Sequence, residues 1–141
     1  MAHAKFTAEV LTPEGQVFDG EVEMVSTRTG VGSLAVLAHH QPMLTLLEPT
    51  ELRLYKSESD IERFAQGEGY MQVTGDSVLV LVEEAVPPGD LDSSDLQERL
   101  RAAEERRDGA DEDSEDRRLA EREITRLRAF LEIAGGGGSG H

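Results

Sequence analysis

One change of character along the chain constrains the fold more than any other feature. Up to Ala85, short β-branched segments such as 77–82 are separated by glycine, proline and aspartate. From Asp92 on, apolar residues recur at helical spacing within a dense field of charge. Residues 87–89 (Pro-Pro-Gly) lie between the two regions, and neither strand nor helix interiors accommodate such a tripeptide well. The sequence therefore predicts a β domain over residues 1–87 and a helical segment over 88–134.

Turn-forming residues divide the first region into short segments, as at 13–15 and 75–76. This rhythm is typical of an antiparallel sandwich or flattened barrel rather than of alternating βαβ units. With four phenylalanines and no tryptophan, the core is expected to consist mainly of Val, Leu, Met and Ala. The predicted fold class is an all-β N-terminal sandwich, or flattened antiparallel β-barrel, followed by an antiparallel α-helical hairpin. The expected strands are 5–11, 16–19, 22–28, 33–37, 43–47, 51–55, 61–66, 70–74 and 77–83.

Two helices are predicted in the second region. The first covers 93–107, with Leu96, Leu100 and Ala103 on one face and Ser94 with Gln97 as a capping box. The second covers 115–133. Both apolar stripes are narrow, so the hairpin is expected to need another surface to pack on. The last segment, 135–141, is predicted to be a flexible tail. The stripe of the second helix consists of Ala120, Ile124, Leu127 and Leu131, broadened by Leu119 and Phe130.

The charge of the chain excludes one class of partner. Its 29 acidic and 14 basic residues give a net charge of −15, which repels phosphate backbones, so nucleic-acid binding is not expected. Because cysteine is absent, disulfides and thiolate metal sites are excluded. We find no signal peptide and no apolar run long enough to span a bilayer, so a cytosolic location is expected, free or docked on a membrane complex.

Motifs that carry chemistry are weak. Residues 30–35 (GVGSLA) fit the loosest dinucleotide fingerprint, but Pro42 interrupts the helix that such a site requires, so a glycine-permitted turn is expected. The pair His39-His40 has no further ligands nearby to complete a zinc site, which favours a loop with one ring bonded to the backbone. No Gly-x-Ser-x-Gly elbow or triad is present, and catalysis by this chain is not expected.

Five arginines of the second helix allow two interpretations. They form either a solvated face with local ion pairs or a cationic surface that docks on an acidic partner. These residues are Arg117, Arg118, Arg122, Arg126 and Arg128.

A resemblance to a known family covers nearly the whole chain. It rests on residues 12–20 (TPEGQVFDG), 21–25 (EVEMV), 32–45 (GSLAVLAHHQPMLT) and the Asp-Leu-Asp entry to the hairpin at 90–92. Together, in this order and spacing, they resemble the epsilon subunit of F-type ATP synthases.

The resemblance implies a non-catalytic subunit of the central stalk. Its sandwich would bind the gamma subunit and sit on the ring of c subunits. Its hairpin would lie folded or extend toward the alpha/beta head and block ATP hydrolysis, with the five arginines meeting acidic segments of the head. Association with the cytoplasmic face of the cell membrane would be peripheral, through the complex alone. The residues implied on the ring and gamma side are Gly32, Ser33, His39, His40 and Pro42.

Departures from the family pattern refine this expectation. Members that bind ATP carry arginine where this chain has Asp95, so no ATP binding and no cofactor are expected. Serine replaces the usual glutamate at Ser33, and Ala38-His39 replaces Pro-Gly. Two other functions stay open from the residues alone. One is a free-standing β-sandwich interaction module with a self-associating hairpin, and the other is a small-ligand protein that uses the sandwich rim.

Overall fold

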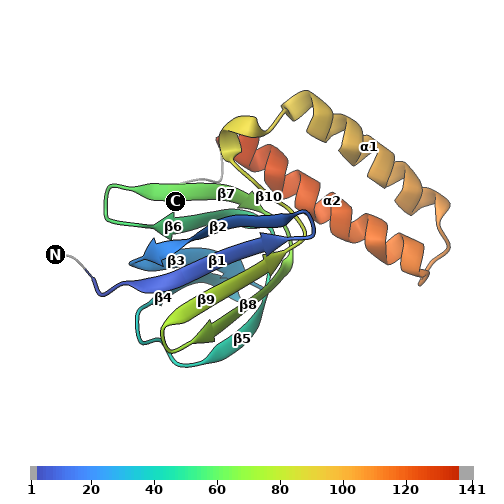
Figure 1. Cartoon of the computed structure of the whole chain (residues 1–141). Helices are drawn as coiled ribbons and strands as arrows, with labels where there is room; N and C mark the ends of the chain where they lie inside the picture. The colour runs from blue at the N-terminus through green and yellow to red at the C-terminus, as the bar shows by residue number, and fades with distance from the viewer. Residues whose placement is uncertain (1–2, 137–141) are drawn as a thin grey trace. The chain divides into compact units, whose positions relative to one another are not determined.

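The computed structural model describes residues 3–136. The chain divides into two compact units, Met1–Pro87 and Pro88–His141, and each is described by itself. The first is a β-sandwich and the second is a pair of helices (Figure 1).

Ten strands form the sandwich within the described residues (Figure 1). Hydrogen-bonded neighbours follow the order β10-β7-β6-β3-β5-β8-β9-β1-β2, and β4 pairs with β3. Pairing is antiparallel except between β1 and β9, which run parallel from Thr7↔Ser77 to Leu11↔Leu81. The strands are β1 (Phe6–Thr12), β2 (Gly15–Val22), β3 (Met24–Thr29), β4 (Gly32–Leu37), β5 (Met43–Leu47), β6 (Thr50–Tyr55), β7 (Ile61–Gln66), β8 (Gly69–Thr74), β9 (Ser77–Val82) and β10 (Ala85–Val86).

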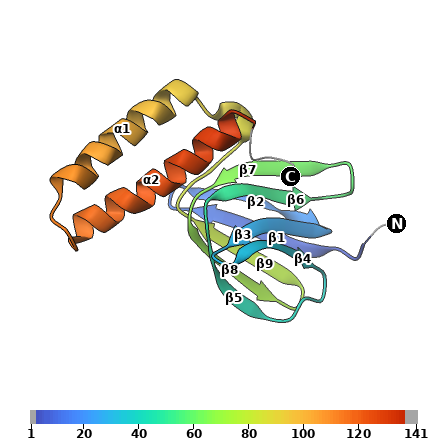
Figure 2. The same cartoon turned by 180° about the vertical axis from the view of Figure 1, so that it is seen from behind.

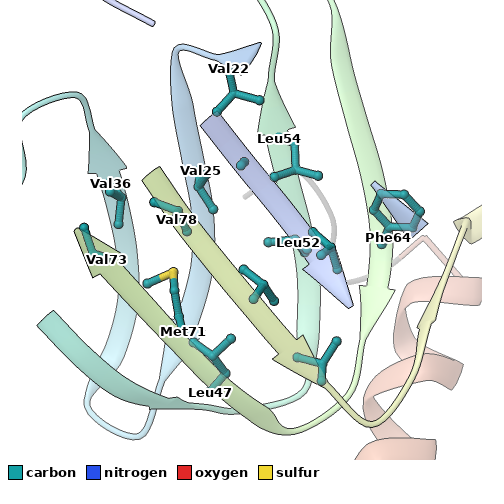
Figure 3. Packing of buried hydrophobic residues seen from close by; sticks show 14 of the residues in the cluster. Val22, Val25, Val36, Leu47, Leu52, Leu54, Phe64, Met71, Val73 and Val78 are labelled. Atoms are coloured by element: carbon teal, nitrogen blue, oxygen red, sulfur yellow. The ribbon is translucent and has the colours of Figure 1, made fainter. Parts of the chain in front are cut away.

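Alternate residues of these strands fill one aliphatic core. On β9, Val78, Val80 and Val82 are buried, whereas Leu81 between them is 39% exposed. Figure 3 shows the labelled core side chains converging from strands far apart in the sequence, with Leu52 and Leu54 of β6 opposite Met71 and Val78. Each fully buried aliphatic side chain contributes about 1.5–3 kcal/mol relative to exposure. The predicted core composition is confirmed.

One buried polar side chain crosses this core. Gln66 is fully buried at the end of β7; its Oε1 accepts from Thr27 Oγ1 at 2.7 Å, and its Nε2 donates to the Glu48 carbonyl at 2.9 Å. Both ends of the amide are therefore satisfied, which removes the penalty for burying it. The contacts tie β3, β7 and the β5–β6 turn together.

Gly69 allows β8 to approach β9 closely. A Cβ at this position would lie 2.0 Å from the Leu81 carbonyl oxygen and 2.7 Å from Val82 Cα. Both are backbone atoms, so no side-chain movement would relieve the overlap. Gly69 is thus required by the packing of the two strands.

The hairpin consists of α1 (Ser93–Gly109) and α2 (Glu115–Ala134), which lie side by side in both views (Figures 1 and 2), after the short 3₁₀ turn η1 (Pro88–Asp90). Asp92 caps α1, because its carboxylate accepts from Ser94 N at 3.0 Å and Asp95 N at 3.3 Å. The expected cap at Ser94 was wrong: α1 begins earlier, so Asp92 is the N-cap and Ser94 lies within the first turn of the helix. Ser114 caps α2 by accepting from Arg117 N at 3.1 Å.

The buried seam of the hairpin differs in detail from the expected stripes. Leu96 and Ala103 of α1 are buried, and Leu100 is half-buried. In α2, Leu119 is 50% exposed and Leu131 is half-buried, whereas Ile133 is buried without having been expected. Ile133 lies two positions beyond Leu131, which brings the seam round to a different edge of the helix. The other buried apolar residues of α2 are Ala120, Ile124, Leu127 and Phe130.

The predicted fold class is confirmed. The nine expected strands correspond to β1–β9, with β2 longer than expected at both ends, and the two-residue β10 was missed. The expected antiparallel pairing has one exception, because β1 and β9 run parallel. Of the expected tail over 135–141, Gly135 and Gly136 bond back to the last turn of α2, and the remainder lies outside the described residues.

Candidate partner-binding surfaces

The glycine-rich segment forms a strand turn. Gly30 and Val31 connect β3 to β4, and Gly32 opens β4 with φ +130°, a value that favours glycine. Thr29 Oγ1 accepts from Val31 N and donates to the Gly32 carbonyl, each at 3.2 Å. A strand rather than a helix follows the turn, so the dinucleotide interpretation lacks the helix N-terminus it requires. Ser33 is exposed on β4.

The other candidate residues of the sandwich lie beyond the opposite end of β4. His39 has φ +64° in the turn after β4, and the Nδ1–H of His40 donates to the Gln41 carbonyl at 2.8 Å. The expected bond between one histidine ring and the backbone is confirmed. At about 3.3 Å per residue, the six residues of β4 separate Gly32 from His39 by about 20 Å. These residues therefore belong to two separate edges of the sandwich.

An exposed apolar surface covers the outer side of β5, β8 and β9. Leu44 and Leu46 of β5 are 72% and 66% exposed, Tyr70 of β8 is 51% exposed and Leu81 of β9 is 39% exposed. The register places Leu46 opposite Tyr70, and Tyr70 opposite Leu81, so their side chains form one row across three strands. We call Leu44, Leu46, Tyr70 and Leu81 the β5–β8–β9 face. A contiguous exposed apolar row marks an interaction site, whereas single exposed leucines do not.

The sequence contains a signal for this face in the composition of its strands rather than in a motif. In β9, Leu79 and Leu81 alternate with the three core valines, so both faces of the strand are apolar. In β5, Leu44 and Leu46 likewise stand at the positions opposite to the buried Leu47. A strand whose two alternate sets of side chains are both apolar is expected to be buried on both faces.

A hollow beside β3 and β6 has a volume of about 170 Å³, which is below the usual range for ligand sites. It is lined by His3, Glu23, Met24, Tyr55, Ser57 and Glu58. Within residues 3–136, no three His, Asp or Glu side chains gather as ligands for a metal ion. Nor is any helix of that range long and apolar enough to cross a membrane.

Two of the five arginines of α2 bond near the hairpin turn. Arg117 Nη1 donates to the carbonyls of Arg107 and Ala110 at 3.1 and 3.4 Å, so a cation lies at the negative end of the α1 dipole. Arg118 donates to Glu115 Oε1 at 3.0 Å and to the Asp113 carbonyl at 3.0 Å. Both guanidinium groups are therefore engaged within the hairpin.

The remaining three arginines differ from one another. Arg128 donates to Glu104 Oε2 of α1 at 3.3 Å. Arg126 is only 9% exposed, so it does not belong to a solvated face. Arg122 is exposed, and within the described part of the chain it makes no ion pair. The five residues thus do not form one uniform cationic surface.

The start of α1 is anionic. Asp90, Asp92 and Asp95 are all exposed there, and the Asp92 carboxylate occupies two of the free N–H donors of the first turn. A helix N-terminus attracts phosphate through such donors. Here an aspartate already holds them and two further carboxylates repel an anion, so this end of α1 does not suit a nucleotide phosphate.

Comparison with known proteins identifies the family. The family model for the ATP synthase delta/epsilon chain beta-sandwich domain matches residues 5–88, which is more than half of the chain. The chain therefore belongs to the family of ATP synthase delta/epsilon chains.

Within that family, the chain is similar to bacterial proteins named ATP synthase epsilon chain. The Brevibacillus brevis protein is 41% identical over 104 residues, which cover 73% of this chain and 75% of the relative. The Persephonella marina protein is 37% identical, covering 92% and 96%. The Halalkalibacterium halodurans protein is 34% identical, covering 89% and 94%. Within the family, the chain thus belongs with the ATP synthase epsilon chains.

Solved structures share the fold. A chain in the mitochondrial ATP synthase of Euglena gracilis, solved as OSCP/F1/c-ring, matches with a TM-score of 0.73 at 20% identity, covering 92% of this chain and 81% of that one. A chain in the central stalk/c-ring structure of Tetrahymena thermophila mitochondrial ATP synthase matches with a TM-score of 0.59 at 16% identity, covering 95% and 99%.

Proposed function

We propose that this chain is a non-catalytic rotor subunit that couples the catalytic head of an F-type ATP synthase to the proton-translocating ring and restrains ATP hydrolysis. The sandwich holds the gamma subunit and contacts the c ring. The hairpin reaches the alpha/beta head and inhibits it. The subunit works at the cytoplasmic face of the cell membrane, as a peripheral part of the complex.

The observation that carries the assembly role is the β5–β8–β9 face. Its four side chains lie on a sheet whose inner side is already filled by the core, so a partner is needed to remove them from water. Burying such a row is worth about 25 cal/mol for each Å² of apolar surface covered. We assign this face to the gamma subunit, which matches the central-stalk context of the structural relatives.

The two edges at the ends of β4 are assigned to contacts with different subunits of the complex. His39, His40 and Pro42 immediately precede β5 and are assigned to the gamma side of the contact. Gly32 and Ser33 lie at the other end of β4 and are assigned to the ring. A single small contact would not include all five residues, because the length of β4 separates them.

The inhibitory role rests on charge and on the hairpin seam. Arginines 117, 118, 122, 126 and 128 lie on one helix of an otherwise acidic chain, and cationic groups fix orientation and register when a complementary acidic surface is present. The seam between the helices is narrow, so the pairing of α1 with α2 can be exchanged for packing of α2 on a partner helix.

The assembly role is tested by reversing the character of the face. The double variant Leu44→Asp, Leu46→Asp places two charges on exposed positions and leaves the core intact. We expect its affinity for the purified gamma subunit to fall by at least about tenfold, because central apolar contacts dominate such interfaces. The control is Val31→Asp at the tip of the β3–β4 turn, where the side chain is 99% exposed and lies outside the face. Unchanged gamma binding by the double variant would remove the basis of the assignment.

A further inference from the structure

The helices of the hairpin are joined by ion pairs that involve the proposed inhibitory arginines. Arg128 of α2 pairs with Glu104 of α1 at 3.3 Å. In the opposite sense, Arg106 of α1 pairs with Glu123 of α2. Only the first pair occupies a cation of α2, because Glu123 contributes an acid. This pair between the helices therefore neutralises the charge of Arg128, which a partner would bind.

The arginines of α2 thus differ in how accessible their charge is. Arg122 is free of ion pairs within the described residues and can meet a partner carboxylate directly. Arg128 is 60% exposed, so a partner can reach it, but its charge is already paired with Glu104. Arg117 is held by the carbonyl end of α1 and is released only when the helices part.

We propose that Glu104 is an intramolecular competitor for Arg128. In the closed hairpin it holds the Arg128 guanidinium, and a carboxylate of the alpha/beta head must displace it to form the inhibitory contact. The inference rests on the proposed inhibitory function and adds its regulation: α1 limits inhibition by offering an acid of its own. Glu104 is a positioning residue, since it acts through Arg128 and touches no partner.

The expected size of the effect follows from the exposure of the pair. An exposed ion pair changes an equilibrium by about two- to fivefold, and salt screens it. Loss of Glu104 should therefore strengthen inhibition by about two- to fivefold, a direction opposite to the loss of Arg128.

The test is a double-mutant cycle on the assembled ATP synthase, measured as ATP hydrolysis. Glu104→Ala should lower hydrolysis in the parent, and it should change nothing when Arg128→Ala is already present. The charge-matched control is Glu105→Ala, one residue along the same helix, where Glu105 is exposed and makes no ion pair within the described residues. This control should behave like the parent.

A second control separates competition from simple loosening of the hairpin. Glu123→Ala removes the pair with Arg106 without releasing a cation of α2, so its effect should be the same with and without Arg128. If Glu104→Ala also acts equally in both backgrounds, or leaves hydrolysis unchanged in the parent, the competitor role is refuted. Removal of residues 88–141 distinguishes failure of the inhibitory function from failure of the competitor role of Glu104. If this truncation leaves ATP hydrolysis unchanged, the inhibitory function itself is wrong. If it raises hydrolysis while Glu104→Ala does nothing, only the competitor role fails.

Discussion

In the sandwich, fifteen buried apolar side chains from nine strands form one cluster, and the fully buried Gln66 is hydrogen-bonded at both ends of its amide. In the described part of the hairpin, seven buried apolar side chains share the structure with exposed ion pairs such as Arg128–Glu104. A buried aliphatic side chain contributes about 1.5–3 kcal/mol, whereas an exposed ion pair contributes about 0–1 kcal/mol. The sandwich is therefore committed to one arrangement. In the hairpin, the exposed ion pairs are the contacts weak enough to be exchanged readily for those of a partner.

The largest expected effect contrasts the two regions directly. Leu52→Ala empties a fully buried site of the sandwich core and should lower the free energy of unfolding by about 2–5 kcal/mol. Leu100→Ala removes the same atoms from a half-buried site of α1 and should cost no more than about 1 kcal/mol. Urea unfolding followed by far-ultraviolet circular dichroism measures both. If the two variants lose the same free energy of unfolding, the packing at Leu100 in the hairpin contributes as much to stability as the packing at Leu52 in the core.

A smaller loss is expected from a backbone contact. Gly69→Ala places a Cβ against the backbone of β9 and should destabilise the sandwich by about 1–3 kcal/mol. Gly75→Ala is the matched control, because a Cβ at Gly75 meets nothing within 4 Å, and it should stay within about 0.5 kcal/mol of the parent. If the two variants melt at the same temperature, the close approach of β8 to β9 is not a constraint on the fold.

The smallest expected effect concerns nucleotide. Millimolar ATP should not raise the melting temperature, because the start of α1 presents aspartates where a phosphate would lie. A ligand at one hundred times its dissociation constant would add about 2.7 kcal/mol, which a thermal scan detects easily. An ATP-dependent rise that Asp95→Ala alters would place a nucleotide on the hairpin and contradict this reading.

The sequence predicted the sandwich well because its strands are short, its turns are marked by glycine and proline, and its core positions alternate. It could not give the parallel pairing of β1 with β9, since these strands are separated by nearly the whole domain and local patterns carry no information on such partners. The β5–β8–β9 face was missed for a different reason. From the sequence, Leu44 and Leu46 resemble core residues. Only the register of β5 with β8 shows which alternate set of side chains faces the core.

For the hairpin, the two helices could be predicted from the sequence, but the ion pairing and burial of their charged side chains could not. Spacing alone placed Arg126 with the other arginines, although its side chain is buried, and placed Leu119 in the seam, although it is half exposed. The pairing of Arg128 with Glu104 depends on how two helices are aligned, and a single helical pattern does not contain that alignment. Site residues that act across elements are therefore the part that requires a structure.

The central claim is that the sandwich assembles and the hairpin regulates. Replacing the full chain by residues 1–87 in an assembled, proton-coupled ATP synthase tests it most directly, with ATP hydrolysis and proton pumping measured on the same preparation. The account predicts that the truncated subunit still co-purifies with gamma, that coupling is retained and that hydrolysis rises. A truncated subunit that assembles but leaves hydrolysis at the level of the full chain would contradict it.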